Sequence, residues 1–160
     1  MDTSTIVIAC ISLAIMSFPF TLSYYNSRKK QQLLVSKIQA IAGQFSNSID
    51  RYDTIWNGII ALDAKAKVLF FYYEGKAGSE TMRIPLSDYN KCELILSELN
   101  VGDLAKTKVI ETVSIRFYPK SNTEKVNDIL LFDGKRGLTL STELNLAKDW
   151  VKILNELRLT

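Results

Sequence analysis

Histidine is absent from this chain of 160 residues, and cysteine occurs only twice, as Cys10 and Cys92. A Ser-His-Asp triad or a Cys-His pair needs an imidazole as its general base, so neither arrangement can form within the chain. Zinc sites that mix cysteine and histidine ligands are excluded for the same reason. The lack of histidine therefore removes the commonest forms of nucleophilic and zinc-dependent catalysis.

Motifs for binding phosphate and calcium are absent as well. The sequence contains no Gly-Lys-Ser or Gly-Lys-Thr, which a phosphate-cradling loop requires. Asp128 and Asp133 flank an apolar run without the ligand spacing of a calcium loop. A pair of carboxylates acting as general acid and base stays open, because distance in sequence says nothing about approach in space. We expect a protein that is not an enzyme, with no catalytic residues, no cofactor and no metal.

Charge is lacking over a long N-terminal stretch. Residues 3–27 carry no charged side chain, and a basic cluster, Arg28-Lys29-Lys30, follows directly. Within this stretch residues 6–25 would span about 30 Å as a helix, which matches the hydrocarbon core of a bilayer. A cleaved signal peptide would carry basic residues before its apolar stretch, and no basic residue precedes this segment. We expect a short tail over residues 1–5 and a retained transmembrane helix over residues 6–25.

The basic cluster predicts the orientation of this helix. Three basic residues follow the segment, whereas only Asp2 and the α-amino group precede it. Basic residues next to a transmembrane helix favour the cytoplasmic side. We therefore expect a single-pass protein of the inner or plasma membrane, with its N-terminus outside and its remaining domain in the cytoplasm.

Beyond the basic cluster the charges nearly balance. Without that cluster and Asp2, 17 basic and 16 acidic residues remain. Nucleic-acid binding needs a concentrated cationic face, so we expect no nucleic-acid partner. Cys92 alternates with Leu94 and Leu96, and this pattern predicts a buried cysteine on a strand.

Residues 26–51 are predicted to form a juxtamembrane helix. Apolar residues recur at helical spacing and give one stripe, formed by Leu34, Ile38, Ile41 and Phe45. The stripe covers barely two heptads, fewer than a sustained coiled coil needs. We expect it to pack against the chain's own domain; the alternative is a short stalk that joins two copies as a homodimer.

The remaining residues, 52–160, show the patterns of an α+β domain. Runs of β-branched, aromatic and alternating apolar residues predict seven strands, over residues 57–63, 67–73, 80–86, 91–98, 108–120, 126–133 and 137–140. The aromatic run over residues 70–73 is expected to bury one face in the core and the other beneath a neighbouring element. Lining a ligand pocket is the alternative for this run.

Helical spacing follows the last strand. Ser141 or Thr142 can cap the N-terminus of a helix, and Glu143 complements the positive end of its dipole. The apolar face of this helix is formed by Leu146, Ala147, Trp150, Leu154 and Leu157.

Seven strands followed by a helix with a central tryptophan resemble the pleckstrin-homology-like superfold. Residues 142–154 look like the closing helix of that family, and Trp150 stands where its characteristic tryptophan packs over one open end of the barrel. The whole chain is similar to small bacterial membrane proteins that join one transmembrane helix to such a domain. The resemblance implies an α+β fold: a transmembrane and a juxtamembrane helix, then a seven-stranded antiparallel barrel or sandwich closed by the C-terminal helix, with Trp150 as structural anchor.

In lipid-binding members of this family, basic residues on the first hairpin hold the headgroup, and the matching hairpin here carries Lys65 and Lys67. The family's further arginine on the following strand is missing, since residues 68–73 are all apolar or aromatic. The candidate residues for contact with lipid headgroups are Arg28, Lys29, Lys30, Lys65 and Lys67.

We expect a membrane-anchored, non-enzymatic module for protein interaction or scaffolding, whose partners are the lipid bilayer and an unidentified protein. Exposed edge strands and the apolar stripe of the juxtamembrane helix are the expected contact surfaces. The alternative is a membrane-proximal sensor that binds lipid headgroups or a small ligand. A lined cavity would favour the sensor, and a bare apolar patch would favour the scaffold.

Overall fold

The computed structural model describes Phe18, Tyr25 and residues 28–55, 57–75, 78–101, 107–121, 126–136 and 142–159. They form an α+β architecture with one helix over residues 28–44, two antiparallel sheets, and a C-terminal helix. The first sheet contains, in spatial order, β1 (Arg51–Ile55), β2 (Gly58–Asp63), β3 (Val68–Gly75) and β4 (Gly78–Pro85). The second contains β5 (Tyr89–Val101), β6 (Thr107–Pro119) and β7 (Asn127–Asp133), and α2 (Glu143–Leu159) is the C-terminal helix. Two short 3₁₀ turns, η1 (Leu86–Asp88) and η2 (Gly134–Arg136), follow β4 and β7.

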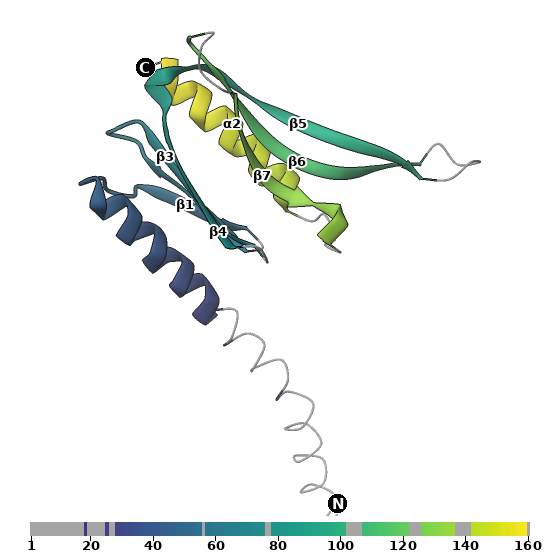
Figure 1. Ribbon diagram of the computed structural model, residues 1–160, viewed down its shortest axis with the longest axis horizontal. Coiled ribbons are helices and arrows are strands. Elements are labelled where there is room, and N and C mark those ends of the chain that lie inside the picture. Colours follow the sequence, from purple (N-terminus) through teal and green to yellow (C-terminus); the bar gives the residue numbers. More distant parts are fainter. Residues whose placement is uncertain are drawn as a thin grey trace, which may run out of the picture.

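These elements stack in layers, as Figure 1 shows: the helix over residues 28–44 covers one face of the first sheet, and α2 and the second sheet lie on the other. The central strands β2 and β3 are consequently buried on both faces. Side chains on a strand alternate between its faces. Phe70 and Tyr72 thus lie beneath the helix, whereas Leu69 and Phe71 enter the main core. This arrangement confirms the expectation that the aromatic run is covered on both sides, and it explains why both strands read as unbroken apolar runs.

The helix over residues 28–44 packs against its own chain, as expected from its apolar stripe. Leu34 and Ile38 are fully buried against the first sheet. The helix nevertheless ends at residue 44 rather than at Arg51. Ser46 adopts a left-handed backbone with φ 57°, and the Asn47 N–H donates to the Ala42 carbonyl at 3.1 Å. This bond is the six-to-one closure of a Schellman motif, which stops a helix and turns the chain away.

The carboxylate of Asp63, which is buried at the end of β2, holds the turn after this helix in place. It accepts hydrogen bonds from the Asn47 side chain at 3.0 Å, from the Ser48 N–H at 2.9 Å and from the Ala66 N–H at 2.8 Å. Burial alone would raise the pKa of this carboxyl, but the hydrogen bonds from Ala66, Asn47 and Ser48 outweigh burial and lower it. Through these hydrogen bonds Asp63 links the turn after the helix to the β2–β3 turn.

Side chains of α2 reach both sheets. The helix begins after Thr142, whose carbonyl accepts the Leu146 N–H at 3.0 Å, and the predicted apolar face enters the main core. Trp150 is fully buried and donates from Nε1–H to Asp53 on β1 at 3.0 Å. The Asn155 amide accepts the Cys92 N–H of β5 at 3.1 Å and donates to the Cys92 carbonyl at 2.9 Å. Cys92 is buried on a strand, as predicted.

The predicted barrel is wrong, because the two sheets do not close on each other. Pro85 and the η1 turn carry the chain from β4 into the second sheet without pairing β4 with β5. In addition, the Asn155 amide takes the backbone groups of Cys92 that would otherwise pair with a further strand. The described strands number seven, but β1 was not predicted, and the predicted strand over residues 137–140 lies outside the described residues.

The predicted membrane anchor also needs correction, because no helix of the described residues is long and apolar enough to cross a bilayer. The helix over residues 28–44 carries basic residues, and α2 has a charged exposed side with Lys148, Asp149 and Lys152. The transmembrane architecture is therefore wrong for the part of the chain that the structure describes. So is the location drawn from it, with the N-terminus outside and the domain in the cytoplasm. The predicted span, residues 6–25, lies outside the described residues except for Phe18 and Tyr25.

Candidate functional site

The five basic residues predicted to contact lipid headgroups do not form one site. Lys29 lies over the Tyr25 ring at 4.6 Å, and Lys30 on the same helical turn donates to the Asn57 side chain, just before β2. Lys65 and Lys67 lie in the turn that follows β2. The length of β2 separates the two groups by about 20 Å, at ~3.3 Å for each residue. A single headgroup cannot contact both ends of this strand.

Trp150, the predicted structural anchor, contacts two residues of β1. Besides its hydrogen bond to Asp53, its ring faces the guanidinium of Arg51, whose central carbon is 5.5 Å from the ring centroid. The indole has no solvent-exposed surface, so these contacts position α2 against the first sheet. Trp150 thus lies at the junction of α2 and β1.

The shifted pKa values arise from ion pairs and hydrogen bonds. Arg116 makes two hydrogen bonds to Asp128, at 2.8 and 2.7 Å, and holds the pKa of that carboxyl below its ordinary value. Tyr72 and Glu74 raise the pKa of the Lys37 ammonium. Among the described residues, every resolved shift lowers the pKa of an acid or raises that of a base. A general acid or base needs a pKa near the working pH, and these shifts lead away from it.

Metal binding finds no support in the same residues. No group of three or more histidine, cysteine, aspartate or glutamate side chains in the described ranges could hold a metal ion. The Cys92 thiol is buried, lying 3.8 Å from the Val151 carbonyl.

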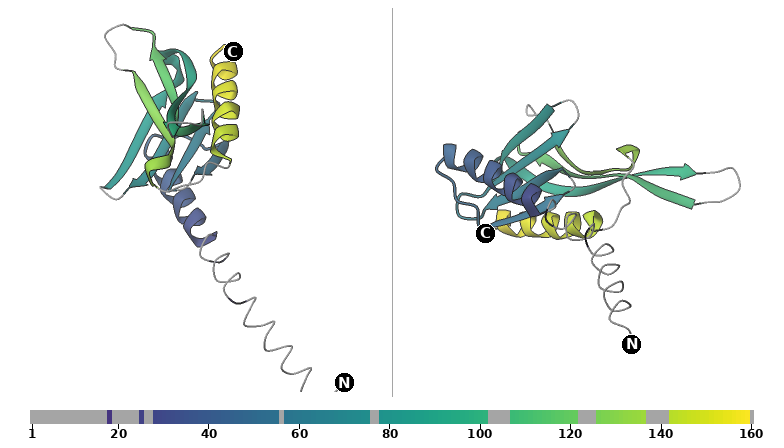
Figure 2. Two further views of the ribbon diagram at one scale, coloured as in Figure 1. Left: turned by 90° about the vertical axis from the view of Figure 1, so that its right-hand side faces the viewer. Right: turned by 90° about the horizontal axis from the view of Figure 1, so that it is seen from below.

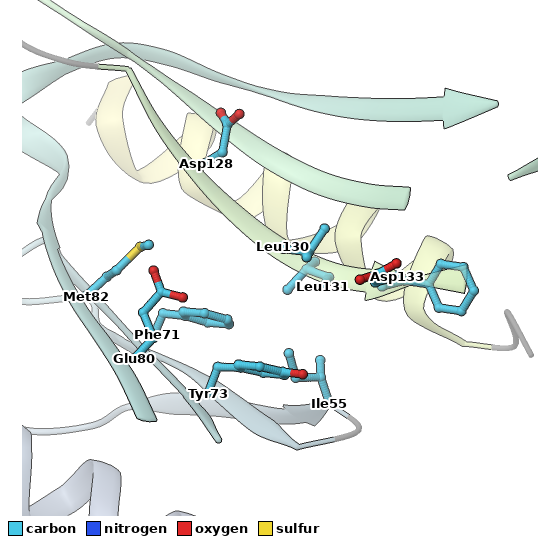
Figure 3. Close-up of a pocket in the computed structure, with 10 residues that line it drawn as sticks. Ile55, Phe71, Tyr73, Glu80, Met82, Asp128, Leu130, Leu131 and Asp133 are labelled. Atoms are coloured by element: carbon cyan, nitrogen blue, oxygen red, sulfur yellow. The ribbon is translucent and has the colours of Figure 1, made fainter. Parts of the chain in front are cut away.

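A small cavity of about 80 Å³ separates the first sheet from β7. Figure 3 shows Phe71, Tyr73 and Glu80 of the first sheet facing Leu130, Leu131 and Asp133 of β7 across this space. Phe71 and Tyr73 belong to the predicted aromatic run, so this run reaches both the core and the cavity. From the sequence, Asp133 was considered only as a calcium ligand and Glu80 was not singled out, because residues on different sheets give no local signal that they line one cavity.

The outer edge of β5 is a second candidate surface. Cys92 directs its N–H and carbonyl away from β6, toward Asn155. Because these groups alternate along an antiparallel strand, Leu94 and Leu96 direct theirs the same way. Neither has a backbone partner at that edge among the residues that the structure describes. We call this unpaired stretch the β5 edge.

The β5–β6 hairpin projects past the rest of its sheet, as the right-hand view of Figure 2 shows. β7 pairs with β6 only as far as Thr112, so β5 residues 98–101 and β6 residues 107–111 form a two-stranded extension, here called the arm. Leu99 and Val109 are cross-strand neighbours in the arm, and each is 47% exposed; Leu96, just before it, is 38% exposed. The arm therefore presents apolar side chains next to the β5 edge.

Comparisons with family models, with curated proteins and with solved structures found no match to this chain. The resemblance to the pleckstrin-homology-like superfold stays a prediction. The homodimer through the first helix stays one as well, although Leu34 and Ile38, two of its expected contact residues, are buried within the chain.

Proposed function

We propose that this chain is a non-enzymatic interaction module that binds an extended segment of a protein partner along the β5 edge. The supporting observation is the row of outward-facing backbone groups at Leu94 and Leu96, continued by the exposed apolar residues of the arm. An edge strand with unpaired N–H and C=O groups is a ready template for pairing with another chain. In such complexes the main-chain hydrogen bonds supply affinity, and alternate side chains supply specificity.

The composition of the edges distinguishes β5 from β1 and β4. β4 is mostly exposed and carries Glu80 and Arg83, and charges on an edge strand discourage pairing with another chain. β1 is only five residues long, and Asp53 in its centre is bound by Trp150. β5 is thirteen residues long, and the centre of the strand is apolar from Leu94 to Leu96, before Ser97 and Glu98. A long edge with an apolar centre favours pairing, whereas short and charged edges oppose it.

A proline substitution can test this proposal, because Leu96 directs its N–H outward. Leu96→Pro removes that donor and leaves the β5–β6 bonds intact, and proline is accepted on an edge strand whose N–H faces solvent. A photo-crosslinking amino acid at position 99 of the full chain is expected to capture a discrete protein partner in cells of the source organism. The same probe in the Leu96→Pro chain is expected to lose that product.

Two controls accompany the experiment. The probe at Tyr52, an exposed aromatic residue on β1, is expected to give no comparable product. Circular dichroism and denaturation of Leu96→Pro establish that the variant is folded. Capture that is equal at positions 99 and 52, or that persists in a folded Leu96→Pro chain, would contradict the proposal.

A further inference from the structure

The unpaired stretch of β5 is limited at each end by a different feature of the fold. At one end the Asn155 side chain occupies the outward N–H and carbonyl of Cys92. At the other end the pairing register of β5 and β6 shifts after Ser97, which marks a bulge. A bulge bends the strands and interrupts regular pairing. The regular, unpaired stretch therefore runs from Glu93 to Ser97, and Ile95 is its midpoint.

The residues of this stretch are arranged symmetrically about Ile95. Leu94 and Leu96 flank it, so the apolar side chains match when the stretch is compared with itself in reverse. The backbone groups are symmetrical as well. Leu94 and Leu96 direct theirs outward, and those of Ile95 point toward β6, because the direction alternates along an antiparallel strand. A strand that binds its own copy in the antiparallel direction requires this match, whereas binding to an unrelated segment does not.

We infer that the partner of the β5 edge is a second copy of this chain, bound antiparallel about a two-fold axis at Ile95. The inference rests on the proposed function, since it names the partner of the same edge. Leu94 of each copy would exchange both main-chain hydrogen bonds with Leu96 of the other, and the two Ile95 residues would face each other without such bonds. Glu93 would lie opposite Ser97, so no like charges would be opposed. The three-stranded sheets of the two copies would then form one continuous sheet.

Neighbouring positions of the axis fit less well. With the axis at Leu94, the hydrogen bonds between Asn155 and β5 would block the outer part of the pairing. The Glu93 side chains of the two copies would also become diagonal neighbours, within reach of each other. With the axis at Leu96, the bulge would fall inside the paired stretch. Only the axis at Ile95 avoids both conflicts.

Disulfide formation between full chains can test this register. The pairing involves few residues, so we expect a reversible dimer that a covalent bond can trap. Every chain carries Cys10→Ser, which leaves the buried Cys92 as its native cysteine. Facing residues without mutual hydrogen bonds have Cα atoms about 4.5 Å apart, within the range of about 4.4–6.8 Å for a disulfide. Ile95→Cys is therefore expected to form a covalent dimer with oxidised glutathione, and the Cys10→Ser chain is not.

Two further cysteine variants are matched controls on the same strand. Glu93→Cys and Ser97→Cys each face the other position across the axis rather than their own copy. The same residue of the two copies would be about 13 Å apart along the strands, at ~3.3 Å for each residue, which is too far for a disulfide. Neither variant is expected to form a dimer alone, whereas an equal mixture of the two is.

The hydrogen bonds at the edge provide the next test. Adding Leu96→Pro to the Ile95→Cys chain removes an outward donor from each copy and is expected to slow covalent dimer formation by roughly tenfold or more. In the photo-crosslinking experiment, residue 99 of one copy would lie opposite Lys91 of the other. The product captured at position 99 is therefore expected to have twice the mass of the chain.

The outcomes distinguish this inference from the proposed function. Glu93→Cys alone that dimerises as fast as Ile95→Cys, or dimer formation that Leu96→Pro leaves unchanged, would overturn the two-fold axis at Ile95. Absence of the Ile95→Cys dimer, together with capture of a different protein at position 99, would overturn the second copy as partner and support the β5 edge as a binding site. Absence of both the dimer and any captured protein would overturn both proposals.

Discussion

At the scale of single residues, Asp63 shows how one buried carboxylate can organise a connection. Its oxygens accept hydrogen bonds from the turn after the first helix and from the β2–β3 turn, two segments that are separate in the sequence. A buried charge is tolerated only when hydrogen bonds replace its hydration. The lowered pKa of Asp63 shows that these bonds overcompensate for burial.

Replacing Asp63 with asparagine should therefore destabilise the chain. The amide keeps the size of the side chain but loses the charge and presents a donor where an acceptor is needed. We expect Asp63→Asn to lower the free energy of unfolding by about 1–3 kcal/mol at pH 7, measured by chemical denaturation. Asp149→Asn, at an exposed position on α2, is the control and is expected to change it by less than about 0.5 kcal/mol.

The pH dependence of the free energy of unfolding provides a second test of the role of Asp63. The pKa of Asp63 in the folded chain is below its ordinary value of 3.8, so the ionised carboxylate contributes stability above that value. The contribution disappears as the pH falls through the lower pKa of the folded chain. The free energy of unfolding of Asp63→Asn should consequently fall less steeply below about pH 5 than that of the unmodified chain. Parallel curves for the two chains would show that the carboxylate is not held as described.

At the scale of elements, side chains of α2 make the contacts between the two sheets that strand pairing would make in a closed barrel. Its Asn155 amide binds both backbone groups of Cys92, as a neighbouring strand would, and its Trp150 indole binds Asp53 on β1. Side-chain contacts of this kind hold two sheets together without closing a barrel. They also cover the first part of the β5 strand and leave the β5 edge beyond it.

Truncating Asn155 should show how much its hydrogen bonds to Cys92 contribute to the stability of the fold. In Asn155→Ala the N–H and carbonyl of Cys92 lose their partner, and we expect a loss of about 1–3 kcal/mol in the free energy of unfolding. Hydrogen exchange of the Cys92 amide should accelerate at the same time. The matched control is Asn145→Ala, an exposed position on the same helix. Equal stability of the two variants would mean that the Asn155 bonds contribute nothing.

Most elements of this fold could be predicted from the sequence, because their apolar patterns are local. The strand over residues 108–120 corresponds to β6, and its alternation places Val113, Ile115 and Phe117 in the core. β1 was missed, because Arg51–Ile55 is short, mostly polar and exposed over its first residues. The helix before it was extended to residue 51, since the left-handed backbone at Ser46 leaves no mark in the sequence of a serine.

The candidate sites were less predictable, because they depend on which strands become neighbours. The interpretation of edge strands as contact surfaces followed from the strand pattern. Only the pairing register of β5, β6 and β7 shows that the β5–β6 hairpin extends beyond the end of β7. Glu80 of β4 and Asp133 of β7 line one cavity, although these strands belong to different sheets. The failure to close a barrel was not predictable either, since it depends on Asn155 and Cys92, which are 63 positions apart.

At the scale of the whole molecule, the described chain divides into a layered body and the arm. The body contains the buried residues, whereas Leu99 and Val109, the only residues from 99 to 109 whose side chains the structure describes, are each 47% exposed. A two-stranded hairpin with no further support is at most marginally stable in water. The arm thus adds little to the stability of the fold and exposes Leu99 and Val109 to solvent.

This division predicts that most of the arm can be removed without unfolding the body. Replacing residues 99–109 with a short Gly-Ser linker retains Glu98, Ile110 and the whole part of β6 that pairs with β7. We expect cooperative unfolding with a free energy within about 1 kcal/mol of that of the full chain, because Leu99 and Val109 are each 47% exposed and bury little apolar surface. Deleting β7 instead removes Ile129, Leu131 and Phe132 from the core and should prevent folding. If the chain without the arm also failed to unfold cooperatively, the arm would be part of the folding unit, and its exposed residues could not be explained by binding alone.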